Sequence, residues 1–282
     1  MSGRRLGTLA LLLAGLVPLW PAGASAQFEE FRARDRGGAG VPTSQFATFI
    51  EAGDLVVYPF YEYYRDRNAE YKPSELGFVG DVDYFGRSRA HEGLLFFGYG
   101  LSSRLVLEFE AAVITARQEK SSDDTSNSPA AGIEESGLGD VEAQLRYRWR
   151  EETGRGPEVF SYFETVFPFQ KSKVLIGTSV WELKYGMGLA RSSSWGTMIL
   201  RGGVAWAEGA AELGEYALEY VRGVSDRLRI YTGVEGSEDE VVLITEAQVF
   251  LTPDIKLKLN SAFGITQKAP GWAPEVGVMF RF

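Results

Sequence analysis

The sequence has 282 residues and a formal net charge of −9 at pH 7, which makes nucleic acid a poor candidate partner. It contains no cysteine and a single histidine, which excludes disulfide bonds and thiolate metal sites and disfavours zinc chemistry. Glycine occurs 33 times and aromatic residues make up 13% of the chain, a combination that suits tight sheet turns and aromatic girdles at membrane interfaces. We therefore expect no cofactor and no metal.

The first 26 residues have the pattern of a secretory signal peptide. Arg4 and Arg5 precede an apolar run over residues 9 to 20, and Ala24-Ser25-Ala26 follows as a small-residue cleavage site. The run is shorter than the ~20 residues that a transmembrane helix needs. Removing residues 1 to 26 takes away two arginines and no acidic residue, so the net charge changes from −9 to about −11.

Residues 27 to 53 form a separate segment before the first predicted strand. It begins with charged residues, continues through Gly37-Gly38-Ala39-Gly40, and is weakly helical or extended over residues 43 to 50. Two interpretations stay open. The segment is either a linker in the periplasm or a plug that folds into the domain that follows.

From residue 54 to residue 282 the chain divides into segments of about 9 to 13 residues, the length of a tilted transmembrane strand. Residues 140 to 149 illustrate the alternation, with Val141, Leu145 and Trp149 on one face and Glu142 and Arg146 on the other. Short turns and longer polar stretches connect the segments, as in outer-membrane barrels. The pattern predicts an all-β, antiparallel, up-and-down transmembrane β-barrel of about 12 strands, at residues 54–64, 90–99, 104–116, 138–149, 158–168, 178–190, 195–206, 213–222, 227–236, 240–250, 255–266 and 274–282. Residues 76 to 85 also alternate, and we assign them to the first external loop.

The last eight residues form a strand with one apolar face. Val276, Val278, Phe280 and Phe282 share that face, and the other face carries polar residues and glycine. The strand resembles the C-terminal insertion signal of bacterial outer-membrane barrels, and the positions that match it are Glu275, Gly277, Phe280 and Phe282. The resemblance implies recognition by the barrel insertion machinery, pairing with the first strand, and location in the outer membrane of a Gram-negative bacterium.

A second resemblance concerns the middle of the chain. Residues 136 to 141 (Ser-Gly-Leu-Gly-Asp-Val), residues 145 to 148 (Leu-Arg-Tyr-Arg), the turn at residues 100 to 105 and residues 164 to 168 resemble outer-membrane barrels grouped under the meta-pathway of phenol degradation. The resemblance implies a barrel of about this size that admits small, often aromatic or hydrophobic, solutes.

The charges predicted to face the lumen divide by height. Acidic residues fall toward the external ends of the strands, and basic residues fall toward the periplasmic ends. The acidic set is Asp140, Glu142, Glu182, Glu215 and Glu235, and the basic set is Arg104, Arg146, Arg148, Arg229, Lys256, Lys258 and Arg281. Either this gradient orients a solute and sets ion selectivity, or the opposite charges pair across the lumen and fill it.

These observations favour a channel for passive uptake of small solutes, most simply as a monomer surrounded by outer-membrane lipid and lipopolysaccharide. One alternative is a barrel without a conducting pore whose external loops bind partners. The acidic runs Asp123-Asp124 and Glu238-Asp239-Glu240 could then gather divalent cations. The other alternative is a lipid-hydrolysing enzyme. His91 is its only candidate base, and Ser88 lies nearby without a nucleophile motif, so we predict no enzymatic activity.

Overall fold

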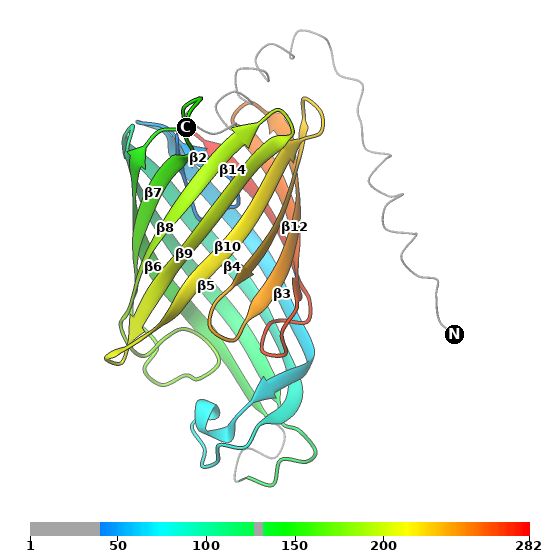
Figure 1. Ribbon diagram of the computed structural model, residues 1–282. Helices are drawn as coiled ribbons and strands as arrows, with labels where there is room; N and C mark the ends of the chain where they lie inside the picture. The colour runs from blue at the N-terminus through cyan, green and yellow to red at the C-terminus, as the bar shows by residue number, and fades with distance from the viewer. Residues whose placement is uncertain (1–39, 127–131) are drawn as a thin grey trace.

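The computed structural model describes residues 40–126 and 132–282 and contains one closed barrel (Figure 1). Twelve strands form the barrel, and each pairs antiparallel with its neighbours in sequence. The strands are β3 (Leu55–Tyr71), β4 (Tyr84–Ser102), β5 (Leu105–Glu119), β6 (Ile133–Arg150), β7 (Glu158–Val166), β8 (Glu182–Ser193), β9 (Gly196–Ala207), β10 (Ala210–Gly223), β11 (Leu228–Gly236), β12 (Val241–Thr252), β13 (Ile255–Gly264) and β14 (Ala273–Arg281). The predicted fold class and strand number are confirmed. The predicted signal peptide, residues 1–26, lies outside the described residues.

The alternation of each strand separates an inner from an outer surface. On β8, Leu183, Met187 and Leu189 point outward and are 39–48% exposed, whereas Gly186 and Gly188 point inward and are buried. A Cβ on either glycine would overlap an aromatic ring of β7, so these positions let bulky side chains of the neighbouring strand occupy the lumen. An apolar outside and a mixed polar and aromatic inside are the arrangement of a barrel in lipid.

The barrel closes between its last and first strands. Phe280 pairs with Val57 and Glu275 pairs with Glu62. Beyond the end of β14, the Phe282 amide donates to the Leu55 carbonyl over 2.9 Å, and the Leu55 amide donates back over 3.0 Å. The terminal residue therefore takes part in the closure, and its recognition by insertion machinery stays a prediction.

The two ends of the barrel differ. Short turns join β4 to β5, β8 to β9 and β12 to β13 at the end where the barrel also begins and finishes, which we call the termini end (top in Figure 1). The longest connections, from β3 to β4, β5 to β6 and β7 to β8, lie at the opposite end, which we call the loop end. Strands β3 to β6 extend farther at the loop end than the other strands do, and the 3-10 helix η2 (Pro73–Leu76) lies beyond them. Residues 76 to 83 lie in this connection and do not form a thirteenth strand, as predicted, whereas Tyr84 and Phe85 begin β4, so their assignment to the loop was wrong.

Inside the termini end lies a small hairpin made of β1 (Val41–Pro42) and β2 (Phe49–Ile50). Its apolar side chains pack against two clusters on the inner wall. Ala47 and Phe49 join a cluster on β7 to β12 that includes Phe160 and Tyr231, and Val41 and Ile50 join a cluster on β3, β4, β5 and β14. Val41, Phe49 and Ile50 are each at most 1% exposed, so residues 40–50 occupy the lumen at this end.

No helix within the described ranges is both long enough and apolar enough to cross a membrane.

Candidate functional site

The hairpin is held in the lumen by cationic side chains that donate to its backbone carbonyls. Arg148 donates to Gly40 over 2.6 Å, Arg146 donates to Pro42 over 3.3 Å, and Arg281 donates to Phe49 over 2.9 Å. On the opposite wall, Arg229 donates to Ala47 over 3.2 Å and Gln248 donates to Phe46 over 3.1 Å. Hydrogen bonds from charged donors are the stronger kind, and here they satisfy carbonyls that the two-residue strands leave without ladder partners.

The tip of the hairpin contacts carboxylates of β5. Ser44 donates to Glu108 through its hydroxyl over 2.7 Å and through its amide over 3.2 Å. The side-chain amide of Gln45 donates to Glu110 over 3.0 Å. Glu108 also pairs with Arg146 over 3.0 Å, so the hairpin closes a network that already connects β5 and β6.

Two inward-facing glycines on β4 make room for the hairpin. A Cβ on Gly98 would overlap the Ile50 side chain, and a Cβ on Gly100 would overlap the Glu51 carbonyl. The absence of side chains at Gly98 and Gly100 thus lets the hairpin lie directly against the backbone of β4.

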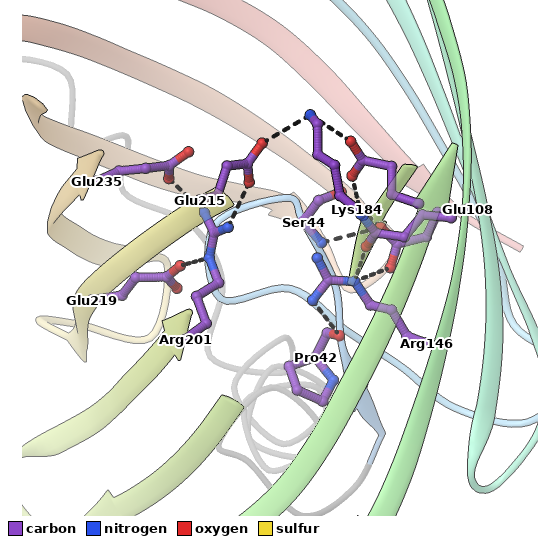
Figure 2. A network of polar contacts seen from close by, with 11 residues as sticks. Pro42, Ser44, Glu108, Arg146, Lys184, Arg201, Glu215, Glu219 and Glu235 are labelled. Carbon is purple, nitrogen blue, oxygen red and sulfur yellow. Dashed lines mark hydrogen bonds and ion pairs between the residues drawn. The ribbon is translucent and has the colours of Figure 1, made fainter. Parts of the chain in front are cut away.

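A second network lies between the hairpin and the loop end (Figure 2). Arg201 on β9 is its centre and binds Glu215 over 2.8 Å, Glu219 over 3.0 Å and Glu235 over 2.6 Å. Lys184 on β8 also binds Glu215, over 3.3 Å, and reaches across to β7. The Arg201 side chain is only 6% exposed, so its charge depends on these three carboxylates.

The lumen is hollow and acidic toward the loop end. Two cavities of about 420 and 510 Å³ share Glu182 and Lys184 in their walls. Their acidic lining residues are Glu75, Asp140, Glu142, Glu182, Glu212, Glu215, Glu235, Glu238, Asp239 and Glu240, against the cations Lys173, Lys184 and Lys268. Lys268 donates to Asp239 over 3.0 Å, and this hydrogen bond raises the pKa of the Lys268 ammonium. We call these two cavities the acidic vestibule.

The structure places nearly all of the predicted lumen charges on inward-facing positions. Asp140, Glu142, Glu182, Glu215 and Glu235 line the acidic vestibule. Arg146, Arg148, Arg229, Lys256, Lys258 and Arg281 lie near the hairpin and are at most 8% exposed. Arg104 differs, because it lies in the exposed turn between β4 and β5 and not on a strand. The alternating pattern of β5 begins directly after this two-residue turn, so the sequence does not show that Arg104 lies just before the strand and not on it.

The predicted gradient had two interpretations, one in which opposite charges pair across the lumen and one in which unpaired charges face a solute. The structure agrees in part with each. Opposite charges do pair, as in Arg148 with Glu158 over 3.6 Å and Lys258 with Glu246 over 3.3 Å. The hairpin and these paired charges lie at the termini end, beside a cavity of about 350 Å³ that Arg229 and Phe250 help to line, whereas the two cavities at the loop end carry an excess of carboxylates.

Sequence reasoning missed several members of these networks. Arg201 is the most important, and its signal was a single cation in the apolar run Ile199-Leu200-Arg201 at an inward position. Glu108, Glu110 and Glu164 were not counted among the predicted lumen charges, although Glu108 and Glu110 alternate with apolar residues on β5. Which cation meets which carboxylate follows from the stagger between strands, which a single strand does not encode.

The residues of the two alternative functions are placed as follows. His91 points outward, where its Nδ1 contacts the Tyr61 hydroxyl over 2.6 Å. Ser88 pairs with the inward residue Asp66, so it lies on the other face of β4 from His91. In the acidic runs, Asp124 accepts a hydrogen bond from Tyr71 over 2.9 Å and Asp239 is bound by Lys268.

Comparison with known proteins extends the assignment of the fold. No protein-family model and no curated protein matches the chain. Among solved structures, an outer-membrane channel from Pseudomonas putida F1 superposes with a TM-score of 0.65 at 15% identity, over 86% of this chain and 100% of that chain. The KdgM porin in complex with disordered oligogalacturonate gives 0.49 at 10% identity, over 80% of this chain and 99% of that chain. The CymD monoaromatic hydrocarbon channel gives 0.42 at 8% identity, over 95% of each chain. The chain therefore has the fold of outer-membrane β-barrels, and its resemblance to the meta-pathway family stays a prediction.

Proposed function

We propose that the protein is an outer-membrane channel of a Gram-negative bacterium and that small solutes cross it by passive diffusion. In this proposal the hairpin of residues 40–50 is a gate at the periplasmic end. The observation that carries the proposal is the combination of a hollow, acidic loop end with a termini end that a separate hairpin occupies. The orientation follows from the termini end, where the short turns, the start of β3 and the end of β14 lie, because these features are on the periplasmic side of bacterial barrels.

The vestibule sets the charge preference of the proposed channel. Its lining has ten carboxylates and three lysines, so its potential attracts cations and admits neutral solutes more readily than anions. The aromatic or hydrophobic character of the solute rests on the family resemblance, and the polar lining of the vestibule adds no support to it.

A gate must be able to leave the lumen, and the polar contacts of this hairpin can be replaced by contacts with water and with the wall. The arginines donate hydrogen bonds to backbone carbonyls, and water can hydrogen-bond to these carbonyls once the hairpin leaves the lumen. The same arginines have wall partners, such as Glu108 for Arg146 and Glu158 for Arg148, so they keep a counter-charge when the hairpin is out.

Planar-bilayer recording of the folded protein tests the proposal. We expect the wild-type protein to show rare or brief openings, and a variant lacking residues 40–50 to conduct continuously with a preference for cations in a salt gradient. A folded deletion variant that stays silent would contradict the channel and favour the alternative of a non-conducting barrel with partner-binding loops.

A reversible cross-link tests the gate separately. The Thr48 hydroxyl on the hairpin lies 3.8 Å from the Met279 sulfur on β14. The chain has no native cysteine, so Thr48→Cys with Met279→Cys reacts at this contact alone with a short bis-methanethiosulfonate, which forms a disulfide bond with each cysteine and releases methanesulfinate. We expect the linked protein to be closed and a reductant to restore the openings, with each single cysteine variant as the control. Conductance that the link does not change would contradict gating by the hairpin.

The setting of the channel belongs to the same proposal. The barrel would be inserted by the outer-membrane machinery through its C-terminal strand, would contact outer-membrane lipid and lipopolysaccharide, and would act as a monomer. Membrane fractionation together with the mass of the detergent-solubilised particle tests location and oligomeric state.

A further inference from the structure

We propose that five arginines on the outer wall of β3, β4 and β5 form a binding site for the phosphate groups of a phosphorylated glycolipid in the outer leaflet. The residues are Arg65, Arg67, Arg87, Arg89 and Arg117, and we call them the arginine cluster. This inference rests on the proposed location in the outer membrane, but it is independent of whether the barrel conducts.

Strand register brings the cluster together. Arg65 on β3 lies directly opposite Arg89 on β4, and Arg89 lies directly opposite Arg117 on β5. Arg87 lies one outward position from Arg89 toward the loop end of β4, and the exposed Arg67 lies in the β-bulge that follows Asp66 on β3. Three like charges in one cross-strand row repel each other, which destabilises a sheet unless an anion lies between them.

The cluster faces away from the lumen. Neighbouring residues in the same strands alternate, and the inward positions between the arginines are occupied by Asp66, Ser88 and Ala90. The side chains of the cluster surround a surface hollow of about 560 Å³, whose other lining residues are Tyr63, Asp66, Ser88 and Glu119. The hollow opens to the surroundings of the barrel and is separate from the acidic vestibule.

The height of the cluster matches the lipid phosphates. Outward residues on β4 are apolar or glycine from Tyr99 to Gly93, His91 follows, and ten residues separate Tyr99 from Arg89. At about 3.4 Å per residue and a tilt of about 40°, this interval rises roughly 26 Å, close to the ~25 Å apolar band of such barrels. The arginine row therefore begins where the hydrocarbon ends.

A group of aromatic side chains lies at the same boundary, next to the arginine row on the side toward the termini end. Tyr63 contacts His91 at 5.0 Å and Trp272 at 6.2 Å between ring centroids, and Tyr61 contacts His91 as well. Amphipathic rings of this kind lie at the level of the headgroups. Lipid headgroups, and not bulk solution alone, are thus the neighbours of the arginines.

The charge of the cluster is largely uncompensated by the protein. Arg117 pairs with Glu119 over 3.4 Å and with Glu134 over 3.3 Å. For Arg65, Arg67, Arg87 and Arg89 the described part of the chain supplies no ion pair, and all four side chains are exposed. Asp66, the remaining carboxylate of the hollow, is buried and accepts a hydrogen bond from the Asn68 amide over 2.7 Å.

The cluster is a basic patch on the outer surface of a chain whose net charge is −9. Planar guanidinium groups bind phosphate through paired hydrogen bonds, which distinguishes them from lysine at such a site. A glycolipid with two phosphates on neighbouring sugars could span the row from Arg65 to Arg117. Its acyl chains would then lie against the apolar band of the barrel, between the arginine row and the termini end.

Native mass spectrometry of the folded protein in detergent, with added bisphosphorylated lipid A, tests the site. We expect the wild-type protein to retain the lipid, and Arg65→Gln with Arg89→Gln to weaken binding by about tenfold per arginine, the change that corresponds to about 1.4 kcal/mol. Arg104→Gln with Arg222→Gln removes two exposed arginines at the termini end and should bind like the wild type. Retained heat-modified mobility on gels shows that each variant is folded.

Two further arms identify what is bound. Lipid A with its phosphates removed should bind weakly to every variant, and inorganic phosphate at millimolar concentration should not displace the lipid. Equal binding of both lipids, equal loss in the two double variants, or displacement by free phosphate would each overturn the proposal. Silence in a bilayer recording would leave this result unaffected, because lipid retention does not require conduction.

Discussion

The tip of the hairpin offers the sharpest perturbation of the proposed gate. Ser44→Ala with Gln45→Ala removes the two side chains of the tip that donate to Glu108 and Glu110, over 2.7 and 3.0 Å. Both substitutions leave the wall unchanged, and Glu108 keeps its ion pair with Arg146. The change therefore acts on the closed state, in which these two bonds exist, and not on the open state.

The size of the effect follows from the bonds that are lost. A hydrogen bond contributes about 0.5–1.5 kcal/mol to a neutral acceptor and about 1.5–3 kcal/mol to a charged one, so the two bonds stabilise the closed hairpin by at least about 1 kcal/mol. Because about 1.4 kcal/mol corresponds to a factor of ten, the ratio of closed to open time should fall at least roughly fivefold. Single-channel recording measures this ratio directly from dwell times.

The control is Ser194→Ala, which removes an exposed hydroxyl from a turn at the same end of the barrel. Its dwell times should match those of the wild type. If the double variant folds and its closed time is also unchanged, the tip does not hold the gate shut. The reasoning from these contacts would then be wrong.

Three other predictions follow from the barrel wall. Arg201→Met should leave Glu219 and Glu235 without a cation and Glu215 with Lys184 alone, which raises the cation preference in reversal-potential measurements and lowers the free energy of unfolding by about 3–5 kcal/mol. Deleting Phe282 should slow assembly in a heat-modifiability assay, since the two backbone hydrogen bonds with Leu55 are lost, and normal assembly would count against the insertion signal. Gly98→Leu should displace the hairpin because its side chain would overlap Ile50, and protease cleavage within residues 40–50 should then increase. Unchanged cleavage would show that the wall adapts instead.

The twelve strands could be predicted because their signal is local. A strand between lipid and a polar lumen must alternate, and β8 or β13 shows this within about ten residues. The same reason explains where the prediction fell short. Beyond the apolar band the outward residues become polar, as at Arg65 and Arg89, so the extensions of β3 and β4 toward the loop end resemble loops in sequence.

The position of the hairpin and the partners of the lumen charges could not be predicted in this way. β1 and β2 are two residues each, too short for a periodic pattern, and their apolar side chains fit a buried plug and a periplasmic contact equally well. Arg201 meets Glu219 and Glu235 only because the strands are staggered around a closed barrel. Closure is a property of the whole sheet, so these contacts appear only when all strands are placed together.

The wall partners of the arginines bear on whether the proposed gate could open although the hairpin is buried. Arg146 and Arg148 each bind a hairpin carbonyl and also a wall carboxylate, Glu108 and Glu158 respectively, and Arg229 binds a hairpin carbonyl and also the side-chain oxygen of Gln248. A wall whose cations depended on the hairpin alone would hold buried, unpaired charges in the open state, at a cost of several kcal/mol each. With wall partners in place, opening breaks hydrogen bonds that water can replace, and the main remaining resistance is the exposure of the apolar side chains of Val41, Phe49 and Ile50. A solute with an apolar part could offset this resistance by contacting the same clusters on the wall, which would couple its passage to the opening of the gate.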